Sequence, residues 1–356
     1  NKDDVNKTDP EASDDSVSKP ENSEHPSDKL NIANDGQDST NATGVVQNCM
    51  ASVVGIYVGN TTISYATGET QEQDTGSGSG VIITDDGYIV TNNHVVQGAD
   101  TIHVYLQDGT KYDAKLIGTD TFSDLAIVKI DVANLPAATI GSSGNVTVGD
   151  TVYAIGNPLG VLTSSVSKGI ISGLDRTITI DGISMTLMQT DASINPGNSG
   201  GGLFNDSGEL IGIVNAKSAS VEVEGLGFAI PVDSARPVIT DLVDLGYVTG
   251  RPYIGITMQD VSLRYGNSNN RNNPFSFYMD NYVTRVQVMS VESGSAAEKG
   301  GLLVNDILMS LNGKEITGSS QFAAMLYEYK VGDTVTITVL RGNETKDLTV
   351  VLGERS

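Results

Sequence analysis

Short apolar runs, each about the length of one strand, recur through residues 46–240, with glycine, aspartate and asparagine between them. The clearest runs are VVGIYV (53–58), GVIITDD (80–86), YIVTNN (88–93), TIHVYL (101–106), LAIVKI (125–130), TVYAIG (151–156) and LIGIVNA (210–216). This rhythm predicts one closed antiparallel β-barrel, or a pair of them, rather than alternating strands and helices. The stretch 232–246 predicts a helix that closes this part of the chain, with Asp233 or Ser234 near its cap and Gly246 at its end.

The segment DASINPGNSGGGLFN (191–205) contains a candidate nucleophile, Ser199, within the run Gly197-Asn198-Ser199-Gly200-Gly201. A serine hydroxyl attacks a carbonyl only when a base takes its proton and nearby N–H groups stabilise the resulting oxyanion. Glycines on both sides of Ser199 allow a tight, open turn that aims two amide N–H groups at one point. Such a site also needs a histidine base and a carboxylate to orient it.

The chain has three histidines, so few residues can supply the base. His25 lies in a polar tail and is a poor candidate. His103 lies in an alternating pattern typical of a strand, where an outward-facing position is favoured. His94 follows the strand-like run 88–90 and enters a loop, which leaves both a core position and a position facing a cleft open.

Asp124 is the candidate carboxylate, because it directly precedes the apolar run 125–128. A buried carboxylate without a partner is costly. A hydrogen bond from the Nδ1–H of His94 would satisfy Asp124 and select one tautomer of the ring. Asp120 is the alternative, but its setting, Gly-Thr-Asp-Thr, fits a turn more simply.

Three segments, TNNHVV, SDLAIVKI and QTDASINPGNSGG, occur in the order His, Asp, Ser and resemble the HtrA/DegP family of trypsin-like serine proteases. The runs 76–96, 154–160, 169–173 and 225–231 agree, and the resemblance covers residues 47–354. It implies a mainly β fold: a chymotrypsin-like double β-barrel protease domain over 45–248, with the cleft between the barrels. A PDZ domain of the α+β class would follow over 249–356.

The resemblance implies a role for each candidate of the triad. Ser199 would be the nucleophile, His94 the general base and then the general acid, and Asp124 the group that orients His94. The oxyanion hole would come from the backbone N–H groups of Gly197 and Ser199, with Asn198 as a further donor.

The resemblance also places a specificity pocket, at Ile194 and at Asn215, Ala216 and Lys217. A small apolar lining suits Val, Ala, Leu or Ile on the acyl side of the cut, while Lys217 either enters the pocket or points to solvent. Gly202 stands where the family commonly has proline or alanine. We expect this glycine to make the backbone after the nucleophile less rigid without affecting catalysis.

In the C-terminal part, Tyr253, Ile254, Gly255 and Ile256 resemble a PDZ carboxylate-binding loop, in which amides capture the C-terminus of a peptide that extends a sheet edge. The run 286–316 is a stronger PDZ signature, with a short helix at 293–299. Residues 318–330 predict a second helix and 334–342 a strand. A polar insert, 264–282, either covers the groove or lengthens its rim.

Composition adds limits. Residues 1–44 carry 11 acidic side chains and four lysines and predict a disordered acidic linker. The net charge of −23 argues against nucleic acid and anionic membranes as partners. The single cysteine, Cys49, excludes an intrachain disulfide and, with three histidines, argues against a zinc site, so we expect no metal and no other cofactor. Cys49 is expected as a small buried residue at the start of the first strand.

The leading hypothesis is an ATP-independent serine endopeptidase that cleaves unfolded or damaged proteins in extracytoplasmic protein quality control and the stress response. The resemblance implies a homotrimer or a larger homo-oligomer, with C-terminal peptides bound at the PDZ domain. The expected location is extracytoplasmic, on the bacterial cell surface or in secreted form. The polar tail and the absence of an initial methionine suggest a spacer that follows an anchoring membrane segment upstream of residue 1. The alternative is a chaperone or peptide-binding protein whose protease is normally held inactive until the loops at 60–75, 160–168 and 216–226 become ordered. A PDZ scaffold with a dead protease is disfavoured, because the triad is intact.

Overall fold

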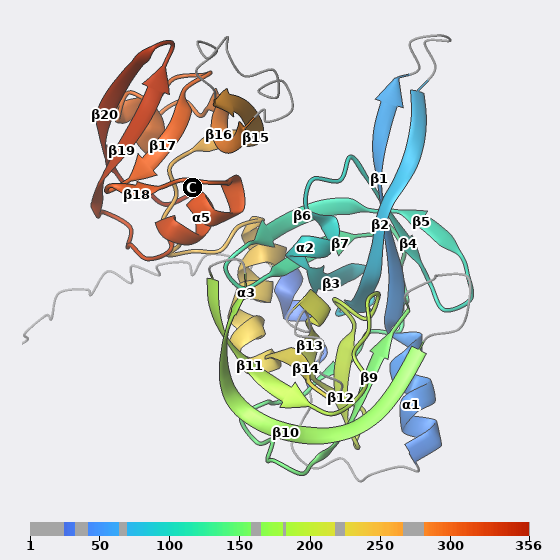
Figure 1. The fold of residues 1–356 in the computed structure, drawn as a ribbon. Helices are drawn as coiled ribbons and strands as arrows, with labels where there is room; N and C mark the ends of the chain where they lie inside the picture. Colours follow the sequence, from blue (N-terminus) through green and yellow to red (C-terminus); the bar gives the residue numbers. More distant parts are fainter. Residues whose placement is uncertain are drawn as a thin grey trace, which may run out of the picture.

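The computed structural model describes residues 25–32, 42–63, 70–157, 165–180, 183–217, 225–265 and 281–355. Within these ranges the strands form three sheets, two of seven strands and one of six. The two seven-stranded sheets lie together, and the third forms a separate C-terminal body (Figure 1). None of the helices in these ranges is both long and apolar enough to cross a lipid bilayer.

The first sheet runs in the order β5-β4-β1-β2-β3-β7-β6, and its neighbours are antiparallel. β5 and β6 stand at opposite ends of this order, yet Ala114 alone separates them in the chain, so the sheet curls until its ends adjoin. The strands are β1 (Val53–Ile63), β2 (Thr70–Ile82), β3 (Tyr88–Asn92), β4 (Thr101–Tyr105), β5 (Lys111–Asp113), β6 (Lys115–Asp120) and β7 (Leu125–Lys129).

The second sheet runs in the order β12-β9-β10-β11-β14-β13-β8. Because β12 pairs with β9 and also with β13, the sheet closes into a barrel, as the strand rhythm predicted. Its strands are β8 (Thr139–Ile140), β9 (Thr151–Gly156), β10 (Ser165–Ile180), β11 (Ile183–Thr190), β12 (Gly202–Asn205), β13 (Glu209–Val214) and β14 (Gly227–Pro231).

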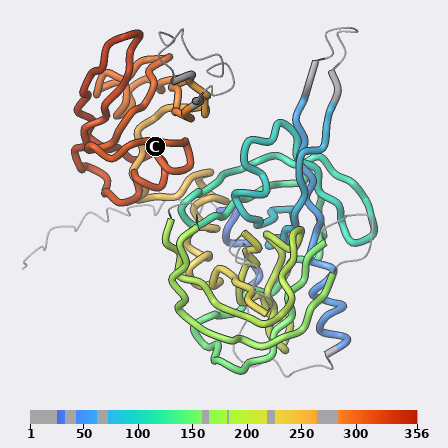
Figure 2. The backbone as a smooth tube through the Cα atoms, viewed as in Figure 1, coloured from blue at the N-terminus to red at the C-terminus, as the bar shows by residue number. Residues whose placement is uncertain are grey.

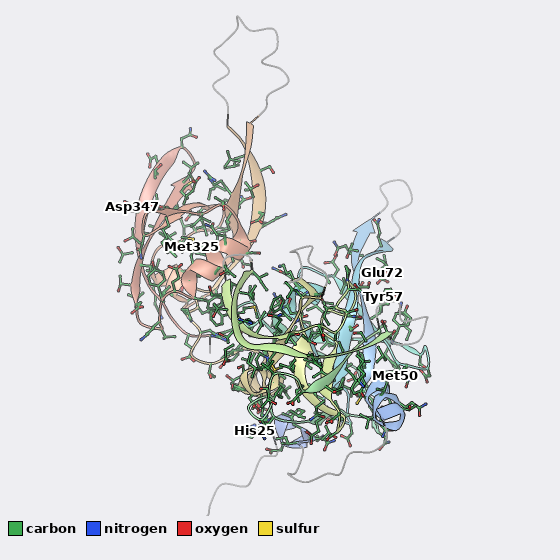
Figure 3. All side chains as sticks on the ribbon, turned by 60° about the horizontal axis from the view of Figure 1, so that its bottom comes forward. His25, Met50, Tyr57, Glu72, Met325 and Asp347 are labelled. Carbon is green, nitrogen blue, oxygen red and sulfur yellow. The ribbon has the colours of Figure 1, made fainter. Side chains whose placement is uncertain are left out.

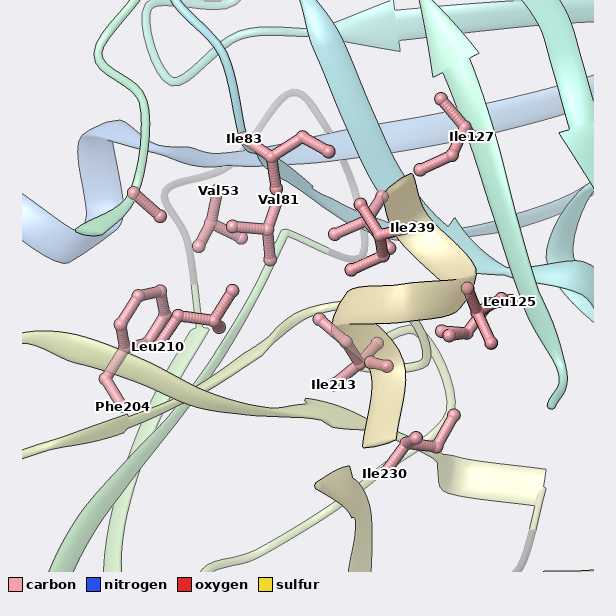
Figure 4. Close-up of a cluster of buried hydrophobic side chains, with 14 of the residues drawn as sticks. Val53, Val81, Ile83, Leu125, Ile127, Phe204, Leu210, Ile213, Ile230 and Ile239 are labelled. Atoms are coloured by element: carbon pink, nitrogen blue, oxygen red, sulfur yellow. The ribbon is translucent and has the colours of Figure 1, made fainter. Parts of the chain in front are cut away.

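The helix α3 (Val232–Leu245) follows the second barrel and ends at Gly246, whose φ of +79° is the left-handed conformation that glycine adopts without strain. The predicted helix is confirmed: its N-cap is Pro231, and Asp233 lies in the first turn, near the cap. Its buried face joins side chains from both sheets in one core (Figure 4). This shared core fixes the position of one barrel relative to the other, which a site built from both barrels requires.

The N-terminal region differs from the prediction of disorder over 1–44. Residues 25–32 are ordered and include a 3-10 helix, η1 (Pro26–Lys29). The backbone N–H and the hydroxyl of Ser27 donate to the Asp244 carboxylate at 3.0 and 2.6 Å, and Ile32 forms a bridge to Ile140. These contacts with α3 and β8 compensate for the low apolar content of the segment. The rest of the predicted tail, 1–24 and 33–41, lies outside the described residues.

A helix that the sequence did not predict, α1 (Ala42–Ala51), precedes β1. Val45 and Cys49 on one face of α1 are buried in the shared core. The prediction that Cys49 is buried is confirmed, with 5% of the residue exposed, but it lies in a helix and not in a strand. Burial raises the pKa of its thiol to about 11.

The hairpin of β1 and β2 projects away from the barrels (Figure 1) and is fastened by His103. His103 is 8% exposed, so the predicted outward-facing position is wrong. Its Nδ1 lies 2.8 Å from Oδ1 of Asp113, and its Nε2 lies 2.6 Å from Oε1 of Glu72, which Figure 3 labels on the hairpin. The two carboxylates form hydrogen bonds with both ring nitrogens, and these bonds offset the loss of water from the buried ring.

Gly202, the departure from the family pattern, begins β12. A Cβ atom at this position would lie 2.3 Å from Cε2 of Phe204, and the Phe204 ring is fully buried in the core. The glycine therefore makes room for an aromatic ring, a packing reason that the sequence did not reveal.

The C-terminal body carries the sheet β15-β16-β17-β19-β20, with β18 paired to β17. The chain enters it once, after α3 (Figure 2). The predicted helices at 293–299 and 318–330 are confirmed in shorter form, as is the strand at 334–342, whereas most of the insert (266–280) lies outside the described residues. The elements are β15 (Ile256–Tyr265), β16 (Asn281–Val291), α4 (Ala296–Lys299), β17 (Ile307–Leu311), β18 (Lys314–Glu315), α5 (Ser319–Leu326), β19 (Thr334–Arg341) and β20 (Glu344–Val351).

A buried ion pair stabilises this C-terminal body. Asp306 is 1% exposed, and its two carboxylate oxygens accept hydrogen bonds from Nε and Nη2 of Arg341, both at 2.7 Å. The amide of Leu303 donates to the same carboxylate at 2.9 Å. Burial by itself would raise the pKa of Asp306, but these donors outweigh it and hold that pKa below its usual value.

Arg341→Met should lower the free energy of unfolding of the C-terminal body by about 3 kcal/mol, because a buried carboxylate loses its partner. The wild-type body should also lose stability on acidification. A carboxylate whose folded-state pKa is depressed stabilises the fold above the unfolded-state value of about 3.9. That contribution disappears as the pH falls through the folded-state pKa. Urea denaturation from pH 7 to pH 2.5 measures both effects.

Lys346→Met is the matched control, because it removes an exposed cation that pairs with Glu344 at 3.3 Å on the surface. Exposed pairs contribute about 0–1 kcal/mol, so its unfolding curve should stay close to that of wild type. Equal urea midpoints for Arg341→Met and Lys346→Met would contradict the assigned role of the buried pair.

Candidate active site

The structure brings the three predicted triad residues together from three separate elements. His94 lies in α2 (Asn93–Val96), directly after β3; Asp124 ends the turn before β7; and Ser199 lies in the connection between β11 and β12. The His94 Nδ1 is 2.7 Å from Oδ2 of Asp124, and its Nε2 is 3.0 Å from Oγ of Ser199. The first sheet thus supplies the histidine and the acid, and the second supplies the serine.

The Asp124 carboxylate is held by more than the histidine ring. Its Oδ1 accepts a hydrogen bond from the backbone N–H of His94 at 3.0 Å, and its Oδ2 also accepts one from Nδ2 of Asn215 at 2.9 Å. Asn215 is fully buried. The sequence predicts Asn215 in the specificity pocket, and the structure corrects this: its amide N–H pairs with the Phe228 carbonyl, which turns the side chain inward behind Asp124.

The backbone before Ser199 forms a type II β-turn. The Asn198 N–H donates to the Asn195 carbonyl at 3.0 Å, with Pro196 and Gly197 at the two central positions. Gly197 has a φ of +97°, which a type II turn requires at its third residue and which glycine adopts without strain. A type I turn would rotate the central peptide and exchange the directions of its N–H and C=O groups.

Ser79, on β2, fastens this turn from the first sheet. Its hydroxyl donates to the Gly197 carbonyl at 2.6 Å, and its N–H donates to the Ser199 carbonyl at 2.8 Å. Across the described residues, the amides of Gly197 and Ser199 have no hydrogen-bond acceptor, and both residues line the same cleft. The Asn198 amide closes the turn instead, so the prediction of Asn198 as an oxyanion donor is wrong.

The cleft has a volume of about 720 Å³ and runs past His94 and Ser199. Of the predicted pocket residues, Ala216 and Lys217 line it. Ile194 instead packs against Gly227, where an added Cβ would lie 2.5 Å from the Ile194 Cγ1 atom. Two of the three loops expected to control activity, at 160–168 and 216–226, lie mostly outside the described residues.

If the Gly197 amide is an oxyanion donor, as the sequence predicts, Gly197→Ala should lower kcat by about 10²–10³, the usual cost of losing one such donor. An alanine at this φ is strained by about 1–2 kcal/mol, and rotation of the peptide relieves the strain by turning the N–H away. Gly149→Ala is the control, because Gly149 has a φ of +103°, open space around its Cα and no place in the cleft. Steady-state kinetics with a peptide substrate should show normal kcat for Gly149→Ala; equal losses in both variants would contradict the role of Gly197.

The predicted carboxylate-binding loop begins at Tyr253, whose backbone pairs with Gly353 in both directions. The Ile254 carbonyl accepts from the Ala297 N–H at 2.7 Å, and the Gly255 carbonyl accepts from the Glu292 N–H at 2.9 Å. Gly255 has a φ of +79°. In the described part of the chain, the amides of Ile254 and Gly255 have no acceptor, which is the pattern of a backbone site for an anion.

The strand that follows this loop, β15, is an edge strand. Within the described ranges it pairs with β16 alone, so its other edge is open to an extended peptide.

The Tyr253 hydroxyl, at the start of the loop, donates to Oε1 of Glu292 at 2.5 Å. Burial, together with this carboxylate, raises the pKa of Tyr253 to about 12, so the ring stays neutral beside the loop.

Comparisons with known proteins agree with this geometry. A family model for the trypsin-like peptidase domain matches residues 78–213, and a model for the PDZ domain matches residues 252–352. The serine protease Do-like HtrA of Bacillus subtilis is 38% identical over 335 residues, which cover 90% of this chain and 74% of the relative. The chain belongs to the HtrA family of trypsin-like serine proteases. It is a serine endopeptidase of that family, with a PDZ domain at residues 252–352.

Other HtrA relatives are similar over shorter shares of their length. The Do-like HtrB of Bacillus subtilis is 42% identical over 78% of this chain and 62% of its own length. A probable periplasmic DegP-like endoprotease of Pseudomonas savastanoi is 41% identical over 80% of this chain and 57% of its own length. Among solved structures, the HtrA-type protease AlgW with a decapeptide has 32% identity and a TM-score of 0.54, covering 89% of this chain and 99% of AlgW.

Proposed function

We propose that Ser199, His94 and Asp124 are the catalytic triad of this HtrA-family protease. Ser199 Oγ attacks the scissile carbonyl while His94 Nε2 takes its proton, and Asp124 stabilises the imidazolium through Nδ1–H. His94 then protonates the leaving amine, and water hydrolyses the acyl-enzyme by the same route. The observation that carries this proposal is the continuous set of hydrogen bonds from Asp124 through His94 to Ser199.

The oxyanion hole we propose consists of the amides of Gly197 and Ser199. The left-handed φ of Gly197 and the absence of an acceptor for either amide in the described residues support a hole that is formed at rest. The alternative function, a chaperone whose protease is normally inactive, is therefore not favoured. An inactive site of that kind needs the peptide before Gly197 to be rotated, which would take Gly197 away from its φ of +97°.

We further propose that the protein acts outside the cytoplasm, at the bacterial envelope, on unfolded or damaged proteins. Relatives named as periplasmic serine endoproteases support this location. The cleft that His94 and Ser199 line must take up an extended stretch of chain, which an unfolded protein offers more readily than a folded one. Assembly into a homotrimer or larger homo-oligomer is proposed from membership of the family.

A fluorophosphonate probe tests the resting state directly, because it reacts with an activated serine and mimics the tetrahedral intermediate. The full-length protein should be labelled at Ser199 without any added peptide, and it should cleave casein. Mass spectrometry of the labelled peptide identifies the site. Labelling that requires a PDZ ligand would favour the alternative, and no labelling under any condition would overturn the protease proposal.

We also propose that the PDZ domain captures the C-terminal carboxylate of a peptide at the Ile254 and Gly255 amides, with the peptide strand added to β15. Fluorescence polarisation with one peptide in free-acid and amidated forms tests this. The free acid should bind at least about tenfold more tightly, a difference of about 1.4 kcal/mol. Equal affinities would contradict carboxylate capture.

A further inference from the structure

The turn between β6 and β7, residues 120–124, carries Asp124 in an unfavourable backbone conformation. Asp124 has a φ of +52°, in the left-handed region, which aspartate adopts more readily than most residues but less readily than glycine. Such a conformation persists where the surrounding structure holds it in place. The groups that hold this turn therefore affect the position of the carboxylate that orients His94.

One of these groups comes from outside the barrels. The Asp120 side chain is 2% exposed, and its Oδ2 accepts a hydrogen bond from Nη2 of Arg251 at 2.9 Å. The same oxygen accepts the Ser123 N–H at 3.1 Å, which closes the turn. Arg251 belongs to the segment between α3 and the PDZ domain, so a residue of the linker neutralises the buried carboxylate of the turn.

The PDZ domain contributes the other side of the same contact. The Arg251 guanidinium carbon lies 4.4 Å from the centre of the Phe122 ring and 5.8 Å from that of Tyr327, and the two rings meet edge to face at 5.2 Å. Tyr327 directly follows α5. Burial raises the pKa of its hydroxyl to about 12, so it stays neutral. Ser320 of α5 also lines a small pocket with His94 and Asp124.

We propose that Arg251 is a positioning residue of the protease. With Asp120, Phe122 and Tyr327 it forms a clamp, here called the Arg251 clamp, that holds the 120–124 turn so that Asp124 stays on His94. The clamp acts on the turn, and none of its four residues lines the cleft. This inference rests on the proposed role of Asp124, and it makes the PDZ domain part of the structural support of the triad.

The charge and the shape of Arg251 both matter to the clamp. The guanidinium pairs with a carboxylate at its end while its flat face packs on a ring, which lysine cannot reproduce because its ammonium is a compact point charge. Removing the arginine also leaves the Asp120 carboxylate buried without its cation, which is costly. The turn can relieve that cost by exposing Asp120, and this movement carries Asp124 with it.

Arg251→Gln in the full chain tests the proposal. The expected result is a loss in kcat of about tenfold or more, equal to about 1.4 kcal/mol of activation free energy, with KM within about twofold. The acidic limb of the pH profile of kcat should shift, because His94 is less firmly held by Asp124. Arg251→Lys should recover part of the loss. Ser199 labelling by a fluorophosphonate should slow in parallel.

Arg285→Gln is the matched control, because it removes a similar ion pair, with Glu315 at 2.6 Å, inside the PDZ domain and away from the turn. Its kcat and pH profile should equal those of wild type. If Arg251→Gln unfolds, Tyr327→Ala tests the proposal in its place, because it keeps the Arg251–Asp120 pair. Tyr327→Ala should still lower kcat and alter the pH profile.

Wild-type kcat and pH profile in both Arg251→Gln and Tyr327→Ala would overturn the inference and leave a contact that only docks the domains. Failure of the wild-type protein itself to react with the fluorophosphonate would instead overturn the proposed triad. The two failures are therefore distinguishable in one set of measurements.

Discussion

Ser199→Ala should lower kcat for a peptide substrate by about 10⁶, because the proposed nucleophile is lost while the rest of the site remains. At about 1.4 kcal/mol per tenfold change, this is about 8 kcal/mol of activation free energy. KM should change little, since the other residues that line the cleft are unchanged. Single-turnover and steady-state kinetics on Ser199→Ala measure the loss.

Ser207→Ala is the control for this substitution. Ser207 lies in the turn between β12 and β13, where its backbone N–H, and not its hydroxyl, bonds to Asn205. Its kcat should be that of wild type. The oxyanion hole and substrate binding alone leave some residual activity. A Ser199→Ala protein that retains more than about one part in 10³ of the wild-type kcat would exceed that residual and contradict the assignment of the nucleophile.

Asp124→Asn should lower kcat by about 10⁴ with little change in structure. The carboxylate accepts hydrogen bonds at Oδ1 from the His94 N–H and at Oδ2 from the His94 ring and Asn215. An amide NH₂ fits better at the Oδ2 position, where the imidazole can change tautomer. Nδ1 then accepts, and the proton moves to Nε2, which can no longer take the proton of Ser199.

Asp131→Asn is the matched control, because Asp131 is exposed after β7 and pairs with Lys115 at 3.0 Å on the surface. It should leave kcat unchanged. A loss smaller than about tenfold for Asp124→Asn would mean that the tautomer is set by other groups. Melting temperatures of the two variants should agree to within a few degrees, which separates a chemical effect from unfolding.

The strands were predictable and the N-terminal helices were not, for one physical reason. The strand runs are apolar, about five residues long and bounded by turn residues, so their local pattern and their tertiary role agree. In α1 the side chains of Val45 and Cys49 are stabilised by the core of the barrels, which no local pattern records. The same holds for 25–32, which is ordered through Asp244 and Ile140, residues more than 100 positions away.

In the site, the residues that residue type alone singles out, the triad, were predictable. The residues whose role depends on which way an amide or a side chain points were not. Three histidines and one Gly-rich serine turn leave few ways to assemble a triad. Asn215 and Asn198 carry no such signal, because one peptide rotation decides whether an amide faces the cleft or closes a turn. Ala216 and Lys217, which directly follow Asn215 in sequence, do line the cleft, so the resemblance located the segment but not the direction of the Asn215 side chain.

The burial of Cys49 has a practical consequence for work in solution. It is the single thiol of the chain, it lies inside the core, and its pKa of about 11 keeps it almost entirely protonated near pH 7. A cysteine introduced on the exposed face of the PDZ domain would therefore be the one position that a maleimide dye reaches in the native protein. A site-specific spectroscopic reporter of domain movement can thus be attached without first removing the native cysteine.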